Sequence, residues 1–343
     1  MNFHTYKISQ NLRVIIFTLS IFVFTGCADE YREHFFLENQ GVPSVSWEAY
    51  IPDATDTLLV LPDKNIKDEL LHSIDSAQER IWIAIYMWTD KDILIHVIDA
   101  HERWVDVRVI LEWNVYGLPR ANATIFSALQ SAWVPVVYAD SYRFTFTHAK
   151  FWVIDGRYYM STGNLTRSFF ETNRDLILSG INPTILSFLG TLFVADFSYK
   201  WVDNSLIPWY MVIAPIDARE KLESLLQGAK RGISIYTQTL EDQRILSLLQ
   251  QKQNAWISIK ICTALNESNT STSSGSIFPW VLVKNPYLHQ KIIIVDGEYV
   301  FLWSQNLTQN SLDNNREVGL IFQDTTRFLP VLDALIQKDC DFD

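Results

Sequence analysis

The feature that most constrains the fold of this chain is an internal repeat. Residues 148–166 read HAKFWVIDGRYYMSTGNLT and residues 289–308 read HQKIIIVDGEYVFLWSQNLT, so the two histidines stand 141 positions apart (289 − 148). Upstream, residues 61–93 resemble residues 214–245 in their order of apolar and polar positions. A chain of 343 residues that repeats itself in this way is expected to form two lobes of the same fold.

Each copy contains an amphipathic helical pattern, an apolar run rich in β-branched residues, and a second helical pattern. Strands that alternate with helices predict an α/β fold, here as two pseudo-symmetric lobes that pack about a pseudo-two-fold axis. We expect the boundary near residues 202–210, which gives lobes of 28–205 and 206–343. The first copy is expected to insert an extra helix and strand around residues 121–138, whereas residues 266–276 of the second copy predict a flexible polar loop.

The first 27 residues predict an export signal. A basic start is followed by an apolar run over residues 14–24, which is too short to span a membrane comfortably. The run ends in Thr25-Gly26-Cys27, and small residues before a cysteine resemble the lipobox of bacterial lipoproteins. The alternative is a plain signal peptide, or a short anchor with an incidental cysteine. The resemblance implies lipidation of Cys27 and a membrane-anchored protein in the bacterial cell envelope, outside the cytoplasm.

Charge and cysteine content narrow the possible partners. The net charge of −11 argues against a general polyanion binder, although a local basic cleft remains compatible with it. Beyond Cys27 there are only Cys262 and Cys340. One disulfide between them is possible, but we expect a buried thiol at Cys262 and an exposed thiol at Cys340. No cysteine or histidine spacing is typical of a metal site, so the prediction includes no metal.

The twin motifs place a histidine and a lysine two positions apart, followed by an aspartate and a polar loop. Side chains two apart on a strand point to the same face, so each histidine is expected beside its lysine. Two such pairs, meeting across a pseudo-symmetric interface, would form a cationic pocket suited to a phosphodiester. Lysines and loop asparagines can hold the non-bridging oxygens, while one imidazole attacks phosphorus and the other donates a proton to the leaving oxygen. The candidate residues are His148, Lys150, Asn164, His289, Lys291 and Asn306.

These residues resemble the phospholipase D superfamily, whose signature is His-x-Lys-x4-Asp followed by a Gly-Ser-x-Asn loop. The resemblance covers essentially the whole mature chain, and in the first copy the stretch before the asparagine is one residue shorter, which we interpret as a gap in the polar loop. It implies two mixed β-sheets flanked by helices, a site at the lobe interface, and no metal or cofactor. It also implies a phosphohistidine intermediate on His148, with His289 as the acid. A lone His-x-Lys is usually a surface strand edge, but two copies with matching asparagines argue against that interpretation here.

Four acidic residues complete the pattern. The resemblance implies that Asp175 and Glu317 each orient a histidine through its other ring nitrogen. Asp155 and Asp296 are expected to be structural, fixing a turn and the ends of strands. Alternatively, Asp175 and Glu317 are ordinary ion-pair partners of the arginine that precedes each of them in the sequence. The hydroxyl residues of the two polar loops are expected to form loop hydrogen bonds rather than to react: Ser161, Thr166, Ser304 and Thr308.

Several tryptophans occupy positions where glycine is expected. Trp303 stands at the glycine of the family loop, where an indole would crowd the phosphate. Trp104, Trp133 and Trp256 each stand between a helical pattern and a strand pattern, where glycine usually ends a helix. The chain has 12 glycines and 12 tryptophans, whereas roughly 24 glycines are average for this length. We hypothesise that these four, with Trp113 as a fifth candidate, are glycines in the living protein, encoded by a reassigned stop codon. As tryptophans, they predict strained helix ends and a partly blocked site.

The leading functional prediction is a phosphodiesterase that hydrolyses or transfers the phosphatidyl group of a phospholipid, acting as a monomer with an internal pseudo-dimer. Water and an alcohol can use the same pocket, so hydrolysis and transfer both remain open. A catalytically inactive binding protein is a further possibility if Trp303 blocks the pocket. The segment LEWNVYG, residues 111–117, follows a strand and could line the cleft. The main alternative is a metal-independent extracytoplasmic nuclease, for which a basic track could come from Arg143, Arg157, Arg167, Lys284 and Arg316.

Overall fold

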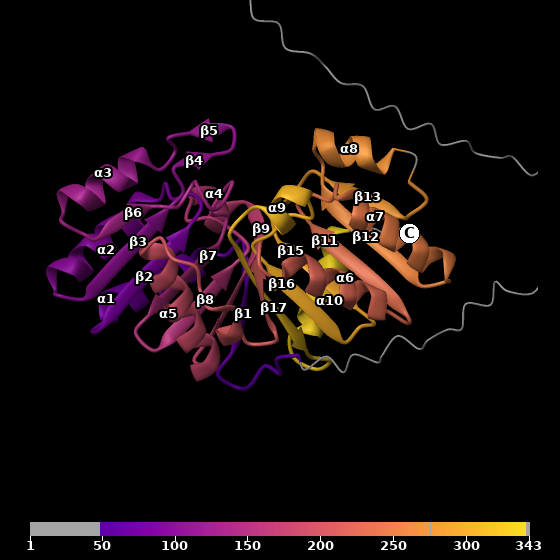
Figure 1. The fold of residues 1–343 in the computed structure, drawn as a ribbon, viewed down its shortest axis with the longest axis horizontal. Helices are drawn as coiled ribbons and strands as arrows, with labels where there is room; N and C mark the ends of the chain where they lie inside the picture. Colours follow the sequence, from indigo (N-terminus) through magenta and orange to yellow (C-terminus); the bar gives the residue numbers. More distant parts are fainter. Residues whose placement is uncertain (1–48, 275, 341–343) are drawn as a thin grey trace, which may run out of the picture. The chain divides into compact units, whose positions relative to one another are not determined.

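The computed structural model describes residues 49–274 and 276–340 and contains two large β-sheets (Figure 1). The first sheet belongs to the first copy of the repeat and has the strand order β1-β9-β8-β7-β2-β3-β6. Strands β2, β3 and β6 are parallel to one another and the other neighbours in this order are antiparallel, so the sheet is mixed. The strands are β1 (Thr57–Leu61), β2 (Arg80–Ile85), β3 (Asp106–Leu111), β6 (Val136–Tyr138), β7 (Lys150–Ile154), β8 (Arg157–Ser161) and β9 (Asn173–Gly180).

The second sheet repeats this arrangement strand for strand, in the order β10-β17-β16-β15-β11-β12-β13. A short strand of the second copy, β14 (Tyr287–Leu288), instead pairs with β9 of the first sheet. The predicted fold, two α/β lobes with mixed sheets, is therefore confirmed. The strands are β10 (Met211–Ala214), β11 (Gly232–Thr237), β12 (Ser258–Ala264), β13 (Trp280–Val283), β15 (Lys291–Val295), β16 (Tyr299–Trp303) and β17 (Glu317–Gln323).

Helices cover the outer face of each sheet. Equivalent helices α2 and α7 begin at equivalent aspartates, Asp90 and Asp242, whose carboxylates each accept two backbone N–H groups. Such caps satisfy donors that a helix leaves free at its start. In the described part of the chain, no helix combines the length and apolar character needed to cross a membrane. The outer helices are α1 (Lys64–Ser76), α2 (Lys91–Glu102), α3 (Ala123–Ser131), α4 (Arg167–Glu171), α6 (Ala218–Gly228), α7 (Gln243–Asn254) and α9 (Gln309–Asp313).

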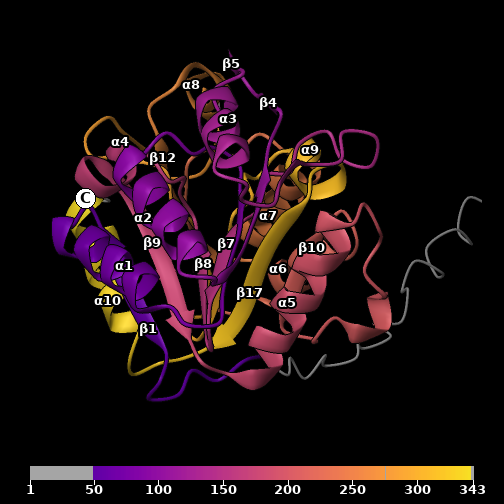
Figure 2. The same ribbon diagram turned by 90° about the vertical axis from the view of Figure 1, so that its left-hand side faces the viewer.

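The two lobes share a central apolar core. Its side chains come from the inner faces of both sheets and from α5 (Pro183–Phe197) and α10 (Leu329–Asp339). Alternation along each strand divides the residues between this core and an outer one, as in β7, where Phe151 faces inward and Trp152 outward. Figure 2 shows α1 and α2 on one side of the first sheet and α5 on the other. Packing on both inner faces therefore holds the two lobes together.

The segment predicted to be a flexible loop contains a helix. Residues 267–273 form α8 (Glu267–Ser273), and β13 follows it as β6 follows α3. The helix and strand near residues 121–138 are therefore not an insertion in the first copy alone. Serine and threonine have low helix propensity, which hid α8 in the sequence. The Asn266 side chain caps the helix by accepting the N–H of Asn269, and Asn269 is fully buried.

The one-residue difference between the two motifs lies in a turn. Ile154 pairs with Arg157 across the first hairpin, whereas Val295 pairs with Tyr299 across the second. The extra residue is therefore Glu298, between β15 and β16, and the interpretation of a gap in the polar loop before the asparagine is wrong. The polar loops themselves are the same length in both copies, so the two sites can superpose.

Three tryptophans end helices in a left-handed backbone conformation, as the sequence predicted. Trp104, Trp133 and Trp256 have φ of 73°, 61° and 65°, and their side chains are 94%, 86% and 95% exposed. In each case the next residue donates its N–H to a carbonyl five residues back, for example Val105 to Ala100 at 3.2 Å. This is the hydrogen-bond pattern in which glycine is preferred, because a Cβ atom makes left-handed backbone unfavourable by about 1–2 kcal/mol.

Trp303 ends β16 and turns its indole into the outer core of the second lobe. It is 1% exposed, its ring centroid lies 3.2 Å from that of Phe301, and its ring nitrogen is buried with no hydrogen-bond partner among the described residues. Across the ladder it faces Gly319, where an added Cβ would lie 2.6 Å from the Trp303 Cβ. The expectation that Trp303 partly blocks the site is therefore wrong, but its indole is crowded and its N–H is unsatisfied.

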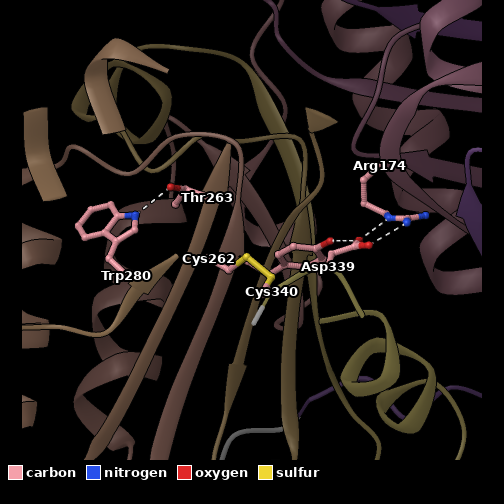
Figure 3. Close-up of a disulfide and its surroundings, with 7 residues drawn as sticks. Arg174, Cys262, Thr263, Trp280, Asp339 and Cys340 are labelled. Carbon is pink, nitrogen blue, oxygen red and sulfur yellow. Dashed lines mark hydrogen bonds and ion pairs between the residues drawn. A yellow bond between two sulfur atoms is a disulfide. The ribbon is translucent and has the colours of Figure 1, made fainter. Parts of the chain in front are cut away.

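Cys262 and Cys340 form a disulfide (Figure 3), so the expectation of one buried and one exposed thiol is wrong. Cys262 lies in β12 and Cys340 directly follows α10; both are buried. The preceding residue, Asp339, accepts hydrogen bonds from the Arg174 guanidinium at 2.6 and 3.0 Å and from the Tyr236 hydroxyl. The disulfide therefore fixes the end of α10 where its carboxylate reaches β9 of the other lobe.

Candidate active site

Each motif histidine lies just before a strand, at a contact between the lobes. His148 precedes β7, and its backbone N–H donates to the carbonyl oxygen of Arg316 at 2.9 Å. His289 precedes β15, and its N–H donates to the carbonyl oxygen of Arg174 at 3.0 Å. Each histidine is thus hydrogen-bonded to the strand of the opposite lobe that carries the predicted acid. Both half-sites lie together at the lobe interface.

The carboxylate behind each imidazole also comes from the opposite lobe. Nδ1 of His148 lies 3.0 Å from both carboxylate oxygens of Glu317, and Nδ1 of His289 lies 2.9 Å from Oδ1 of Asp175. A carboxylate only accepts, so Nδ1 carries the proton in both rings. In a neutral ring this leaves Nε2 as a free lone pair, which is the form required of a nucleophile or a base.

The alternative pairing of these acids with the preceding arginines is not formed. The Arg174 guanidinium pairs with Asp339 at 2.6 Å. Arg316 is completely buried and pairs with Asp196 at 3.0 Å. Both arginines therefore join elements of the fold and leave Asp175 and Glu317 to the histidines.

The two motif lysines are buried beside the histidines, with exposures of 1% for Lys150 and 0% for Lys291. Nζ of Lys150 donates to the carbonyl oxygen of His148 at 2.6 Å and lies 5.3 Å from the ring centroid of Tyr86. Nζ of Lys291 donates to the carbonyl of its own histidine and to Oε1 of Gln238 at 3.1 Å. Across residues 49–274 and 276–340, neither lysine has a carboxylate within 4.0 Å of its nitrogen, so both charges can serve a bound anion.

Asn164 and Asn306 lie in the equivalent polar loops. The carboxamide oxygen of each is buried and has no hydrogen-bond partner within the described residues. Next to them, Thr162 Oγ1 donates to Asp175 at 2.7 Å and Ser304 Oγ donates to Glu317 at 2.6 Å. The same loop therefore provides a buried amide and a hydroxyl that fixes the acid behind the opposite lobe's histidine.

Burial is the main electrostatic influence on the site. It lowers the pKa of His148 to about 4 and also lowers the pKa of His289. The facing carboxylates raise both pKa values, and the charges of Lys150 and Lys291 lower them. Burial also lowers the pKa of Lys291 to about 8 and places that of Lys150 well below its ordinary value. For Glu317, burial raises the pKa but His148 and Lys150 outweigh it, and the net pKa falls. Near neutral pH, the free protein therefore holds neutral imidazoles beside a charged carboxylate.

Asp155 and Asp296 lie away from the imidazoles, at the opposite ends of β7 and β15. The Asp155 carboxylate accepts the backbone N–H groups of Gln78, Glu79 and Arg80 at 2.9–3.0 Å. Asp296 accepts those of residues 230, 231 and 232 in the same way. Both have a positive φ, 50° and 59°. Each carboxylate therefore joins the hairpin turn to the start of the neighbouring antiparallel strand, β2 in the first lobe and β11 in the second.

Several residues of the site were not singled out from the sequence. Tyr86 packs the edge of its ring against His148, with centroids 4.5 Å apart, and Gln238 occupies the equivalent position beside Lys291. Glu112 is 4% exposed and accepts the N–H of Thr147, just before His148, at 2.6 Å. Aligning the residues directly after β2 with those directly after β11 could have identified the first two. Glu112 belongs to the segment 111–117 that we expected to line the cleft.

Of the five basic residues proposed for a nucleic-acid track, three are paired with carboxylates. Arg316 is buried in its ion pair with Asp196. Arg143 is bound to Asp140, and Arg167 pairs with Glu171. Arg157 donates to Ser179, and Lys284 is exposed. Cys27, the predicted lipidation site, lies outside the described residues.

The structure is that of a duplicated α/β protein. Each of its two mixed sheets contributes a His-Lys strand, and the two strands meet at the interface between the lobes. The chain belongs to the phospholipase D superfamily: the model of the family described as "Cardiolipin synthase, PLD-like domain" matches residues 70–196 and 222–339. The two matched segments cover both copies of the repeat. No curated protein sequence matches the chain.

Two solved structures show the same fold over most of the described chain. Phosphatidylserine synthase from Haemophilus influenzae Rd KW20 aligns with a TM-score of 0.64 at 12% identity, over 84% of this chain and 87% of that one. Polyphosphate kinase from Porphyromonas gingivalis aligns with a TM-score of 0.65 at 17% identity, over 82% of this chain. The chain spans about half, 49%, of the kinase's length. Nuc from Salmonella typhimurium, described as a phospholipase D family member, aligns over 42% of this chain at 19% identity with a TM-score of 0.39.

Proposed function

We propose that this protein is a phosphodiesterase of phospholipase D type that hydrolyses or transfers a phosphatidyl group. The observation that carries the proposal is the crossed arrangement of imidazoles and carboxylates, His148 with Glu317 and His289 with Asp175. Two oriented imidazoles beside two buried ammonium groups can supply a nucleophile, an acid and an anion site. These are the components that transfer of a phosphodiester needs.

In the first step, Nε2 of His148 attacks phosphorus. The N–P bond forms as the P–O bond to the head-group alcohol breaks, and His289 gives its proton to that oxygen. His289 acquires this proton when the diester binds, because an adjacent negative charge favours the imidazolium form. Lys150 and Lys291 bind the non-bridging oxygens, together with the loop asparagines.

In the second step, His289 is neutral and takes a proton from water or from a second alcohol. The oxygen so activated attacks phosphorus as the N–P bond breaks, and His148 recovers its lone pair. Water as the acceptor gives a phosphate monoester, and an alcohol gives a new diester. The same residues serve both outcomes, so access of the acceptor decides between hydrolysis and transfer.

A membrane substrate agrees with the predicted export signal, in which Cys27 would be lipidated and hold the enzyme at a bilayer in the cell envelope. The disulfide between Cys262 and Cys340 supports an extracytoplasmic location, because disulfides persist in oxidising compartments. The net charge of −11 also favours a lipid substrate over a long polyanion.

The test combines lipid vesicles with a soluble nitrophenyl phosphodiester, whose good leaving group needs little acid catalysis. We expect the full chain to release head groups from phospholipid vesicles with or without chelator. His289→Ala should release about one equivalent of nitrophenol and then stop, with the phosphoryl group on the peptide that contains His148. His148→Ala should give no burst. Substantial turnover by both variants would refute the mechanism, and a label on residue 289 in His148→Ala would exchange the two roles.

A metal-independent nuclease is the second candidate, and the same preparation tests it with DNA in the presence of chelator. Of the arginines proposed for its basic track, Arg316 is buried and Arg143 and Arg167 are paired with carboxylates. The inactive binding protein requires Trp303 to fill the pocket, but its side chain packs in the outer core. The lipid enzyme therefore has the stronger support.

A further inference from the structure

The two half-sites share a feature that the repeat in the sequence does not contain. Asn122, just before α3, is 1% exposed and donates from Nδ2 to the carbonyl oxygens of Tyr86 at 2.8 Å and Glu112 at 2.9 Å. Its Oδ1 accepts the N–H of Trp88 at 2.8 Å. Since Tyr86 follows β2 and Glu112 follows β3, one carboxamide joins the ends of two neighbouring parallel strands.

Asn269 forms the same bridge in the second lobe. It is fully buried, donates to the carbonyl oxygens of Gln238 and Ala264 at 2.7 Å each, and accepts the N–H of Leu240 at 3.1 Å. The bridged strand ends are equivalent between the lobes, 152 positions apart (238 − 86), but the asparagines are 147 apart (269 − 122). The segments that carry them, before α3 and within α8, do not resemble each other. We call these two interactions the asparagine bridges.

Each asparagine bridge fixes one residue that contacts the His-Lys pair. Tyr86 lies against His148 and under the ammonium of Lys150. Gln238 accepts from Lys291 and donates from Nε2 to the Tyr287 hydroxyl at 3.0 Å. Tyr287 in turn stacks near His289, with ring centroids 6.4 Å apart.

A capping role does not explain these asparagines. Asn122 stands at the N-cap position of α3, yet its side chain makes no capping hydrogen bond. In α8 the cap is Asn266, not Asn269. Both carboxamides instead direct their hydrogen bonds to the strand ends beside the site. Buried, fully satisfied polar groups of this kind fix a unique local geometry.

We propose that Asn122 and Asn269 are a matched pair of positioning residues, which hold Tyr86 and Gln238 against the His-Lys pairs of their half-sites. For its kinetic effect this inference rests on the proposed function. Tyr86 contacts the His148 ring directly. Gln238 reaches His289 through its hydrogen bonds to Lys291 and to Tyr287, whose ring stacks near that histidine. The expected effect is specific to the lobe: Asn122 acts on His148, and Asn269 acts on His289.

The test uses the full chain with Asn122→Ala and Asn269→Ala, and Asn182→Ala as the matched control. Asn182 also accepts two backbone N–H groups, but at the start of α5 and away from the site. We expect kcat on a soluble nitrophenyl diester to fall about 10–100-fold in the first two variants, with KM little changed, because small displacements at a reacting centre cost rate. The control should keep the parent kcat. Asn122→Asp, which keeps the volume and the acceptor but loses both N–H donors, should behave like Asn122→Ala.

A titration of the histidine ring nitrogens by NMR separates positioning from general destabilisation. In Asn122→Ala the pKa of His148 should move towards its ordinary value while that of His289 stays as in the parent. In Asn269→Ala the pKa of His289 should move and that of His148 should stay. Equal titrations in parent and variants, or a kcat equal to that of the control, would overturn the proposal. If the parent turns over no diester but the titrations shift as expected, the proposed function fails and the positioning role stands.

Discussion

At the scale of single residues, the buried lysines determine how the site responds to pH. Burial lowers the pKa of Lys291 to about 8, so its cationic form is lost as pH rises through that value. We expect kcat/KM for a soluble diester to fall above about pH 8, because a neutral amine binds the phosphate poorly. Lys291→Arg stays charged at high pH and should abolish this alkaline fall, although its planar head group lowers the absolute rate.

The measurement is a pH profile of kcat/KM for the parent, Lys291→Arg and the control Lys284→Arg, whose lysine is exposed. The control should retain the alkaline fall of the parent. The same fall in Lys291→Arg would mean that another group, with Lys150 as the nearest candidate, sets the alkaline limit.

The tryptophans with a left-handed backbone conformation lead to a prediction about stability. Replacing Trp104, Trp133 or Trp256 by glycine should raise the free energy of unfolding by about 1 kcal/mol each, because the strain of a Cβ at positive φ outweighs the extra freedom of an unfolded glycine. Urea denaturation measures the change. Tyr142→Gly is the control, since Tyr142 is 100% exposed at ordinary φ, and it should not be stabilised. Loss of stability in all three tryptophan variants would contradict the prediction.

The recoding hypothesis concerns the same positions and has a separate test. If a reassigned stop codon encodes them, protein purified from its native source will contain glycine at residues 104, 133, 256 and 303, as peptide mass spectrometry can read directly. A glycine at 303 would also remove the crowded indole opposite Gly319. Tryptophan in all four peptides would reject the hypothesis.

At the scale of elements, we expect the hairpin aspartates to contribute to stability and not to catalysis. Asp155→Ala leaves three backbone N–H groups without their acceptor and should lower the free energy of unfolding by about 3 kcal/mol. Asp203→Ala, which removes an exposed cap on residue 205, should lower it much less. Because Asp155 lies at the far end of β7 from His148, kcat of the folded Asp155→Ala should stay close to that of the parent. A large loss of kcat at unchanged stability would reverse this assignment.

The sequence predicted the elements whose patterns are strong. Repeated apolar runs located the central strands, and the His-x-Lys spacing placed His148 and Lys150 on one strand face. Helix α8 was missed because its stability comes from the tertiary contacts of Asn269, which local propensity does not contain. Tyr86 and Gln238 were missed for a related reason, since an aromatic ring and an amide at equivalent positions share no chemical pattern.

Pairing between distant segments was harder to predict. Which acid faces which histidine depends on how the two lobes meet, and the order of residues along the chain suggests the uncrossed pairing as readily as the observed one. The disulfide was left open for the same reason, because only the fold shows that α10 returns to β12. The sequence thus identified the reacting groups and left their partners to the three-dimensional structure.

At the scale of the whole molecule, the disulfide should control both stability and activity. Joining residues 78 positions apart should stabilise the fold by about 4 kcal/mol. We expect reduction, or Cys262→Ala with Cys340→Ala, to lower the melting temperature. The same changes should lower kcat, because Asp339 then holds Arg174, the residue beside Asp175, less firmly. The double variant should show no further response to reductant, and an unchanged kcat in it would separate the disulfide from the site.

The disulfide also bears on when the enzyme can become active. A newly made chain in a compartment rich in reduced glutathione would keep its two sulfurs apart, and the last helix would be free to leave its neighbours. With the proposed export, oxidation would secure that helix only outside the cytoplasm, and with it the side chain that supports one half of the proposed reaction centre. Under the proposed function, phospholipid cleavage would then be restrained while the protein is still beside the inner leaflet of the cell that makes it.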